Sequence, residues 1–465
     1  MSHNFDPSIL REYDIRGIIG ETLEADDARA IGRSFGTLLK RAGGSTVAVG
    51  YDGRQSSPML EHAVVEGLTA SGCDVVQIGL SATPMLYYAE ASDAKVDGGI
   101  QITGSHNPPN YNGFKMVFQG RPFFGQDIQR IGEIAASGDW EDGAGTVSER
   151  PVMDSYIERL LEGLDGIDRT ALASLKVGWD AGNGAAGPAL EQLVAKLPGE
   201  HHVLFAEVDG AFPNHHPDPT VKENLEDLIA LMKTGDYDIG VAFDGDADRV
   251  GVVDETGEII WADQLMALFL PEVIQNKGDE ILYDVKCSQA LEEMIEKYGG
   301  TPIMWKTGHS LIKQRMFELK CRFGGEMSGH IFFADDYYGY DDAIYVAARA
   351  VQMLSRSDKT LSEMLAELPK YYSTPELRLE VENDEEKFRI ANEAIEYFKA
   401  NYDCSTVDGV RIRFGDGWGL VRSSNTQPVI VCRFEANSQE RMEEIQALVM
   451  GKLQEFGTLK LDAGH

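Results

Sequence analysis

Apolar and polar positions along the chain form three similar units, each a short apolar strand followed by an amphipathic helix. Strands are predicted over 46–52, 176–180 and 280–284, and each ends in an aromatic residue followed by aspartate: Asp52, Asp180 and Asp284. Small residues come next, and helices are predicted over 59–71, 188–197 and 289–298. The aspartates are spaced by about the length of a domain, which predicts three similar α/β domains in tandem. Chance similarity of three strand–helix units is the alternative.

The pattern changes beyond Pro369. Strands are predicted over 377–381 and 410–414, and helices over 385–398 and 439–456. Shifts in composition then divide the chain into residues 1–152, 153–256, 257–369 and 370–465. The predicted fold class is α/β, with three tandem mixed α/β domains followed by a smaller C-terminal α+β domain.

Composition limits the function. The 465 residues are too many for one core, and 76 acidic against 42 basic residues give a formal charge of -34. Such a charge repels nucleic acid and anionic membranes, so we expect neither as a partner. The five cysteines form no CxxC pattern, which argues against a disulfide framework or a zinc site. No signal peptide and no run of about 20 apolar residues is found, so a cytoplasmic location is predicted.

The stretch TGSHNPPNYNGFK, residues 103–115, follows a predicted strand over 98–102 and is read as a loop stiffened by its two prolines. A hydroxyl needs a base or a cation nearby before it can accept or donate a phosphoryl group. His106 lies directly beside Ser105, and Lys115 follows ten positions on. Ser105 is therefore a candidate nucleophile. A polar turn that bonds its own backbone is the alternative.

A second loop places Asp244, Asp246 and Asp248 at alternate positions after a predicted strand over 239–243. Three carboxylates so close together repel one another unless a hard cation offsets them, which predicts a magnesium site. Arg249, the next residue, could pair with an anion there. A calcium EF-hand is one alternative, because Glu255 is the twelfth residue from Asp244, although the β-branched flanks and the missing sixth-position glycine count against it. A solvated acidic turn is the other.

Two further loops suit a phosphorylated sugar. In GGEMSGH, Glu326 and Ser328 could bond to adjacent sugar hydroxyls, with a glycine-rich turn as the alternative. In RSSNTQP, the guanidinium of Arg422 and the following hydroxyls suit a phosphate monoester, with a polar hairpin loop as the alternative. The remaining basic candidates are Arg16 in REYDIRG, which is alternatively a charged turn, and Lys286 and His309 on loops after predicted strands.

Together, TGSHNP, DGDADR, GEMSGH and RSSNTQP resemble the motifs of the α-D-phosphohexomutases in order and spacing, over essentially the whole chain. REYDIRG, NGFK, TGHS and the methionine of GEMSGH are similar to the bacterial phosphomannomutase/phosphoglucomutase branch. The resemblance implies a heart-shaped molecule in which one loop from each domain meets in a central cleft. It also implies that Ser105 becomes a phosphoserine that shares Mg²⁺ with the three aspartates, and that Glu326 and Ser328 bind the sugar 3- and 4-hydroxyls. The residues implied to hold the non-reacting phosphate are Arg422, Ser424, Asn425 and Thr426, with Ser423 beside them.

The implied reaction interconverts hexose 1-phosphates and 6-phosphates of mannose and glucose through a hexose 1,6-bisphosphate that reorients, with glucose 1,6-bisphosphate as activator or intermediate. His330, His309 and Lys115 remain open as the base. The other expected catalytic residues are His106, Arg16 and Arg249, and Tyr13, Arg16, Lys286, His309 and His330 are expected to contact substrate. The alternatives are a phosphoglucosamine mutase, against which Met327 counts, and a non-catalytic hexose-phosphate sensor. The expected partners are small hexose phosphates, and a monomer is expected rather than a homodimer.

Overall fold

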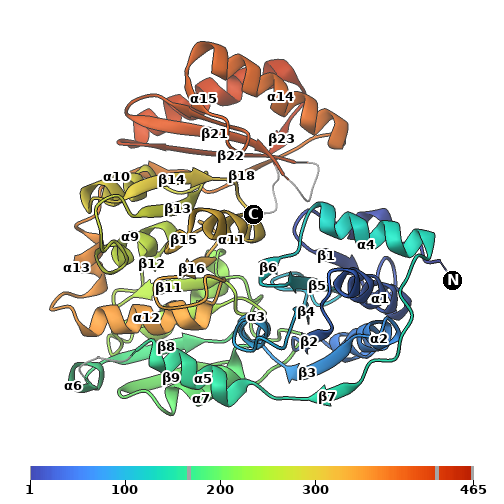
Figure 1. Ribbon diagram of the computed structural model, residues 1–465. Helices are drawn as coiled ribbons and strands as arrows, with labels where there is room; N and C mark the ends of the chain where they lie inside the picture. The colour runs from blue at the N-terminus through green and yellow to red at the C-terminus, as the bar shows by residue number, and fades with distance from the viewer. Residues whose placement is uncertain (1, 165–168, 425–428, 462–465) are drawn as a thin grey trace.

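The computed structural model describes residues 2–164, 169–424 and 429–461 and has three α/β domains followed by an α+β domain (Figure 1). In the first domain the sheet has the order β1-β5-β4-β2-β3-β7, with β6 paired to β5. Its strands are β1 (Ile15–Ile18), β2 (Thr46–Tyr51), β3 (Asp74–Leu80), β4 (Gly98–Ile102), β5 (Tyr111–Phe118), β6 (Arg121–Pro122) and β7 (Val147–Glu149). Its helices are α1 (Ala25–Arg41), α2 (Ser57–Ala70), α3 (Thr83–Ala91) and α4 (Gln126–Ser137), with a 3-10 turn at Pro7–Ile9.

The second domain has the sheet order β12-β11-β10-β8-β9, and the third has β14-β13-β15-β16. The second contains β8 (Lys176–Asp180), β9 (Glu200–Leu204), β10 (Ile239–Phe243), β11 (Val250–Asp254), β12 (Ile259–Ile260), α5 (Met153–Glu162), α6 (Arg169–Leu172), α7 (Gly187–Val194), the 3-10 turn Lys222–Leu225 and α8 (Glu226–Met232). The third contains α9 (Ala262–Val273), β13 (Glu280–Asp284), α10 (Gln289–Lys297), β14 (Thr301–Trp305), α11 (His309–Leu319), β15 (Phe323–Gly325), β16 (Ile331–Phe333), α12 (Ala343–Ser355) and α13 (Leu361–Leu365).

One topology recurs in these three domains. The first strand of each unit, β2, β8 or β13, pairs in parallel with a strand on each side. One of these neighbours, β4, β10 or β15, is followed by a strand that pairs with it in antiparallel fashion. The loop between these two strands carries a predicted motif in every case: TGSHNP between β4 and β5, DGDADR between β10 and β11, and GEMSGH between β15 and β16. The predicted tandem arrangement of three similar domains is confirmed.

The fourth domain is built on an antiparallel sheet in the order β19-β20-β21-β22-β18-β23, with β17 paired to β22. Its elements are β17 (Tyr372–Ser373), β18 (Leu377–Glu380), α14 (Asp384–Asn401), β19 (Asp403–Ser405), β20 (Val410–Arg413), β21 (Gly417–Ser423), β22 (Val429–Ala436), α15 (Gln439–Phe456) and β23 (Lys460–Leu461). Both helices lie on one face of this sheet (Figure 1). The predicted C-terminal α+β domain is confirmed.

Two kinds of contact join the domains. Alternating residues of β2 face opposite sides of the sheet: Val47 and Val49 pack with α1 and α2, whereas Ala48 belongs to a core that continues through the second and third domains. The fourth domain has a core of its own and docks on the third through a small cluster around Trp418. There Arg411 lies over the Trp418 ring, 3.8 Å from its centroid, and donates to the carbonyl oxygen of Val285 at 2.7 Å. No helix in the described ranges is long and apolar enough to span a bilayer.

Candidate active site

Ser105 lies at the junction of the first and second domains. Its side chain is almost completely buried, and its Oγ donates a hydrogen bond to Asp244 Oδ2 at 3.0 Å, across 139 residues of sequence. His106 Nδ1 lies 3.2 Å from the same oxygen. The backbone φ of Ser105 is 48°, a left-handed conformation that costs about 1 kcal/mol or more for a residue with a Cβ. The surrounding structure must therefore hold this loop in place.

Arg54 supplies much of that support. Its buried guanidinium donates to the carbonyl oxygens of Ser105 (2.8 Å), Asn107 (2.6 Å), Pro108 (2.6 Å) and Tyr111 (3.0 Å). A planar donor group with five N–H bonds suits this convergent set of acceptors. Arg54 carries no local signal of this role, because it lies in a short polar stretch and all four acceptors come from residues about fifty positions later.

The repeated strand-end aspartates also hold site loops. Asp52 accepts from the backbone N–H of Gly104 at 3.1 Å, next to Ser105. Asp284 accepts from the backbone N–H of Met327 at 3.2 Å, in the GEMSGH turn. Equivalent carboxylates in the first and third domains thus fix equivalent loops. From the sequence alone these aspartates mark the repeat but give no sign of this role.

The carboxyl groups of Asp244, Asp246 and Asp248 are fully buried, and each offers an oxygen within 4.8 Å of the others. In the described chain, Asp246 Oδ1 and Asp248 Oδ1 have no hydrogen-bond partner. Burial, together with the charges of Asp246 and Asp248, raises the pKa of Asp244 well above its ordinary value. Hard oxygen donors that lack partners and repel one another fit Mg²⁺.

The alternatives for this loop are wrong. β10 and β11 form an antiparallel hairpin around it, whereas an EF-hand needs helices on both sides. Glu255, the twelfth position, instead accepts a hydrogen bond from the backbone N–H of Ser362 at 3.3 Å. A solvated acidic turn is equally excluded, because the three aspartates have no exposed surface.

Lys115 reaches this acidic group from the first domain. Its Nζ donates to Asp246 Oδ2 at 2.7 Å and also to Asp248 Oδ2. Burial alone would lower the pKa of Lys115, but the nearby carboxylates outweigh it and raise the pKa above the ordinary lysine value. A lysine held in its charged form is a poor proton acceptor. The predicted loop was too long here: residues from Tyr111 onward form β5, because they pair with β4 on one side and β1 on the other.

Two histidines from the third domain face the same region. Arg249 Nε donates to His330 Nε2 at 3.0 Å, so this ring nitrogen is an acceptor whose lone pair is directed at the guanidinium. The His309 ring stacks on that of His330 with centroids 5.1 Å apart. Burial, followed by the charge of Lys313, lowers the pKa of His309 to about 4. Asp341, which the sequence analysis missed, lies behind both rings, with Oδ2 3.0 Å from His330 Nδ1 and 3.4 Å from His309 Nδ1.

The other first-domain candidates line the Ser105 loop. Burial, then the charges of Arg249 and Arg16, lowers the pKa of His106 well below the ordinary histidine value. Arg16 donates to the side chain of Asn107 and pairs with Asp14. Arg16 belongs to β1 and not to a solvated turn, because β5 offers β1 an edge with which to pair. His106 and Arg16 therefore both lie on the Ser105 loop or in contact with it.

The GEMSGH turn carries the residues that were expected to contact a sugar. The N–H of Glu326 donates to the carbonyl oxygen of His330 at 2.8 Å, and the N–H of Gly329 donates to that of Glu326 at 3.1 Å, which closes the turn. The Glu326 carboxyl is buried and accepts from the N–H of Gly308. Burial raises the pKa of Glu326 above its ordinary value. Ser328 lies half-buried on the same turn.

Two cations lie where the fourth domain meets the third. Lys286 Nζ lies 3.4 Å from Glu376 Oε2. Arg422 Nε donates to Asp408 Oδ2 at 2.9 Å, and the N–H of Thr307 donates to the same oxygen at 3.1 Å. Each cation therefore faces one carboxylate of the fourth domain.

Tyr13 connects this region with the first domain, since its hydroxyl donates to the carbonyl oxygen of Thr307 at 2.8 Å. Arg422 and Ser423 were expected in a loop but are the last residues of β21, where they pair with β22. The N–H of Ser424 donates to the carbonyl oxygen of Val429 at 3.0 Å. Asn425 and Thr426 lie outside the described residues.

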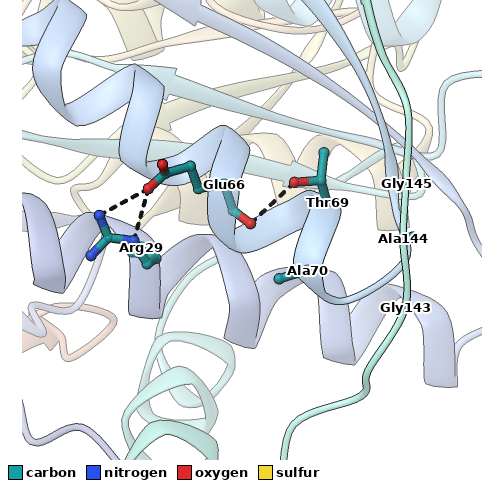
Figure 2. Close-up of a pocket in the computed structure, with 7 residues that line it drawn as sticks. All are labelled: Arg29, Glu66, Thr69, Ala70, Gly143, Ala144 and Gly145. Carbon is teal, nitrogen blue, oxygen red and sulfur yellow. Dashed lines mark hydrogen bonds and ion pairs between the residues drawn. The ribbon is translucent and has the colours of Figure 1, made fainter.

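A surface pocket of about 520 Å³ lies elsewhere on the first domain, between α1, α2 and the segment before β7 (Figure 2). It is lined by Arg29, Glu66, Thr69, Ala70, Gly143, Ala144 and Gly145. Arg29 Nε donates to Glu66 Oε2 at 2.9 Å, which ties the two helices together, and Arg29 also pairs with Asp26 of its own helix. The lining includes none of the candidate site residues.

Fold and site together define a phosphoryl-transfer enzyme, because a hydroxyl able to carry a phosphoryl group meets an acidic trio able to bind a metal, with the GEMSGH turn close by. Comparisons with protein families identify the four domains. The alpha/beta/alpha domains I, II and III of phosphoglucomutase/phosphomannomutase match residues 7–142, 154–257 and 261–372, and the C-terminal domain matches residues 375–452. The chain belongs to the phosphoglucomutase/phosphomannomutase family.

Similar proteins extend over nearly the full chain. A phosphomannomutase/phosphoglucomutase of Pseudomonas putida is 46% identical over 94% of this chain and 94% of its own length. That of Pseudomonas aeruginosa is 44% identical over 96% of this chain and 95% of its own. A crystal structure of a phosphoglucomutase/phosphomannomutase family protein from Burkholderia thailandensis superposes with a TM-score of 0.91 at 43% identity, covering 98% of this chain and 99% of the other. The predicted family and its mutase activity are confirmed.

Proposed function

We propose that this mutase interconverts the 1- and 6-phosphates of mannose and glucose through a phosphoserine at Ser105 and a hexose 1,6-bisphosphate that reorients. The observation that carries the proposal is the contact between Ser105 Oγ and Asp244 Oδ2, 3.0 Å apart across the junction of two domains. It places a hydroxyl in a strained, rigid loop directly against an acidic trio. Binding alone requires no such nucleophile, which counts against a sensor.

Asp244, Asp246 and Asp248 would hold Mg²⁺ together with the seryl phosphate. A bound divalent cation supplies charge neutralisation at the phosphoryl oxygens and orients them. Basic residues of the chain add to this positive charge. Lys115, already paired with Asp246 and Asp248, and Arg249, beside them, bring positive charge to the site of an otherwise strongly acidic protein.

His330 is the proposed base. Lys115 is held charged by its carboxylate partners, and burial lowers the pKa of His309 to about 4, which makes it a weak base. His330 Nε2 accepts from Arg249 Nε at 3.0 Å, beside the acidic trio, and would exchange this contact for the substrate hydroxyl. The substrate hydroxyl gives its proton to His330 Nε2 while its oxygen bonds to phosphorus and the bond from phosphorus to Ser105 Oγ breaks. The return transfer runs through the same atoms in reverse after the bisphosphate turns.

Substrate orientation falls to the third and fourth domains. Glu326 and Ser328 would bind the 3- and 4-hydroxyls, whose configuration mannose and glucose share. Arg422 and Lys286 would bind the non-reacting phosphate, which would replace Asp408 and Glu376 as their anionic partner. The remaining residues proposed around this phosphate are Tyr13, Ser423, Ser424, Asn425 and Thr426. Glucose 1,6-bisphosphate would act as activator, and the protein is proposed to work as a cytoplasmic monomer.

The test is a mutase assay of Ser105→Ala with glucose 1-phosphate and with mannose 1-phosphate, in Mg²⁺ and glucose 1,6-bisphosphate. We expect turnover to be lost with both sugars while the melting temperature stays close to that of the wild type. Intact-protein mass should show one phosphate on the wild type and none on the variant. Turnover by Ser105→Ala, or a wild type that never gains phosphate from the bisphosphate, would overturn the proposal. Faster turnover of glucosamine 1-phosphate than of either hexose would favour the phosphoglucosamine mutase alternative.

A further inference from the structure

The acidic loop, residues 244–249, lies against the first residues of two helices from other domains. The carbonyl oxygen of Ala247 accepts from the N–H of Ala343, the first residue of α12, at 3.2 Å. The carbonyl oxygen of Asp246 accepts from the N–H of Thr83, the first residue of α3, at 2.9 Å. The first N–H groups of a helix have no partner within it, so they can bond to a neighbouring loop. The first and third domains therefore both hold the main chain of this loop.

Thr83 bonds to Asp246 a second time, through its side chain. Its hydroxyl donates to Asp246 Oδ2 at 2.5 Å, across 163 residues of sequence, and neither side chain has exposed surface. Thr83 is followed by Pro84, whose ring fixes its own backbone angle and suits the first turn of a helix. One residue at the start of a helix thus contacts both the main chain and the carboxylate of Asp246.

The two oxygens of the Asp246 carboxylate have different surroundings. Oδ2 accepts from Thr83 Oγ1 and from Lys115 Nζ, the latter at 2.7 Å, and both donors belong to the first domain. Oδ1 is buried and has no hydrogen-bond partner among the described residues. Mg²⁺ demands near-ideal geometry, so a carboxylate whose rotation is fixed in advance is the better ligand. Oδ1 is therefore the oxygen left to a cation.

We propose that Thr83 is a positioning residue of the metal site: its hydroxyl holds Asp246 Oδ2 and thereby turns Oδ1 toward the ion. This inference rests on the proposed binding of Mg²⁺ by the acidic trio. Lys115 is shared between Asp246 and Asp248, so it does not by itself define the rotation of either carboxylate. The hydroxyl of Thr83 adds a second donor with a single direction.

The test compares two substitutions at Thr83. Thr83→Val keeps the branched shape and the backbone N–H but loses the donor, whereas Thr83→Ser keeps the donor. In Thr83→Val we expect Mn²⁺ and Mg²⁺ to bind about 10- to 100-fold more weakly, the usual effect of losing a group that orients a metal ligand. Mn²⁺ binding is measured on protein phosphorylated with glucose 1,6-bisphosphate, from the electron paramagnetic resonance signal of the free ion, and Mg²⁺ binding by competition.

Turnover should show the same loss as a change in metal dependence. The Mg²⁺ concentration for half-maximal turnover should rise by the factor seen in binding, while kcat at saturating Mg²⁺ stays within about threefold of the wild type. Thr83→Ser should restore both the metal affinity and the Mg²⁺ dependence.

The matched control is Thr37→Val. Thr37 is another fully buried threonine of the first domain, and its hydroxyl oxygen accepts from the N–H of Glu141 at 3.0 Å. The control should leave metal affinity unchanged even if it lowers the melting temperature as much as Thr83→Val does. Weaker metal binding in both variants, in proportion to their loss of melting temperature, would mean that Thr83 is only structural.

Crystals of the wild-type protein with Mn²⁺ decide the assignment even if Thr83→Val does not fold. The anomalous signal should place the ion against Asp246 Oδ1, with Thr83 Oγ1 still bonded to Oδ2. An ion bound through Oδ2, an unchanged affinity in Thr83→Val, or a loss in Thr83→Ser as large as in Thr83→Val would overturn the inference while leaving the proposed metal site intact. A wild type that binds no Mn²⁺ at the three aspartates would overturn the metal site itself, and Ser105→Ala tests the phosphoserine separately.

Discussion

Gly245 offers a direct test of the contact between the first two domains. It lies inside the acidic loop, between Asp244 and Asp246, and a Cβ built on it would come within 2.4 Å of the Ser105 carbonyl oxygen. Ordinary van der Waals contact begins near 3.4 Å, so Gly245→Ala is short of space by about 1 Å. The carbonyl cannot easily move away, because Arg54 Nη2 donates to it at 2.8 Å.

The strain must therefore separate the Ser105 loop from the acidic loop. A misplacement of about 1 Å between reacting groups costs ~10²-fold in rate, and overpacking of this kind costs about 1 to 3 kcal/mol of stability. We expect kcat to fall by about 10²-fold with both hexose 1-phosphates. KM should change little, because the residues proposed to bind the sugar and its second phosphate belong to the third and fourth domains.

The assay is mutase turnover with saturating Mg²⁺ and glucose 1,6-bisphosphate, together with the melting temperature and the mass of the phosphorylated protein. Gly451→Ala is the control: Gly451 lies within α15, a built Cβ meets no atom within 4 Å, and alanine there should stabilise by about 1 kcal/mol without affecting kcat. A Gly245→Ala variant that keeps a kcat within about twofold of the wild type would refute the claim that this interface positions the nucleophile.

Three further predictions follow from buried charges. Lys115→Met leaves Asp246 and Asp248 without their cation, so the free energy of unfolding in metal-free buffer should fall by about 3 to 5 kcal/mol and partly recover in MgCl₂, as measured with urea. His309 has a pKa of about 4 when folded, against about 6.5 when unfolded, so its contribution to stability is present above pH 6.5 and is lost as pH falls toward 4. His309→Asn should therefore remove about 3 kcal/mol of acid sensitivity in urea titrations across that window, and an unchanged pH slope would contradict this. In Arg54→Lys the amine cannot reach all the loop carbonyl oxygens, so the free energy of unfolding of the first domain should fall by about 3 kcal/mol and kcat by about tenfold. A kcat equal to that of the wild type would show that the Ser105 loop keeps its conformation without Arg54.

Local sequence patterns predicted the elements of the three repeats closely. The strands at 176–180 and 280–284 and the helix at 439–456 have the predicted ends, because alternation, helical periodicity and flanking small residues all agree there. The predicted helix over 188–197 ends instead at Val194. The loops that carry the motifs were also placed correctly at strand ends. Such features depend on residues close together in the sequence.

The missed features depend on partners distant in sequence. Arg54 looks like a polar turn residue until the loop after β4 brings its carbonyl oxygens to it. Asp341 follows a tyrosine-rich turn, and its place in the site is visible only once α11 and the β15–β16 turn place His309 and His330 beside it. The strand at 15–18 reads as a charged turn, because its partner strand begins almost a hundred residues later. Burial of a polar side chain is a tertiary property that no local pattern encodes.

The two parts of the site are held differently, and the proposed reaction requires this. Phosphoryl transfer needs Ser105, the acidic trio and His330 fixed relative to one another, and these residues belong to the three domains that share a continuous core. The cations proposed for the non-reacting phosphate instead lie where a separately cored domain meets the third, each already matched by a carboxylate. When the bisphosphate turns end for end, its two phosphates exchange places between Ser105 and the cations of the third and fourth domains. The region around these cations must therefore accept either the 1-phosphate or the 6-phosphate. A rigid centre for chemistry and exchangeable ion pairs for binding therefore satisfy opposite demands within one chain.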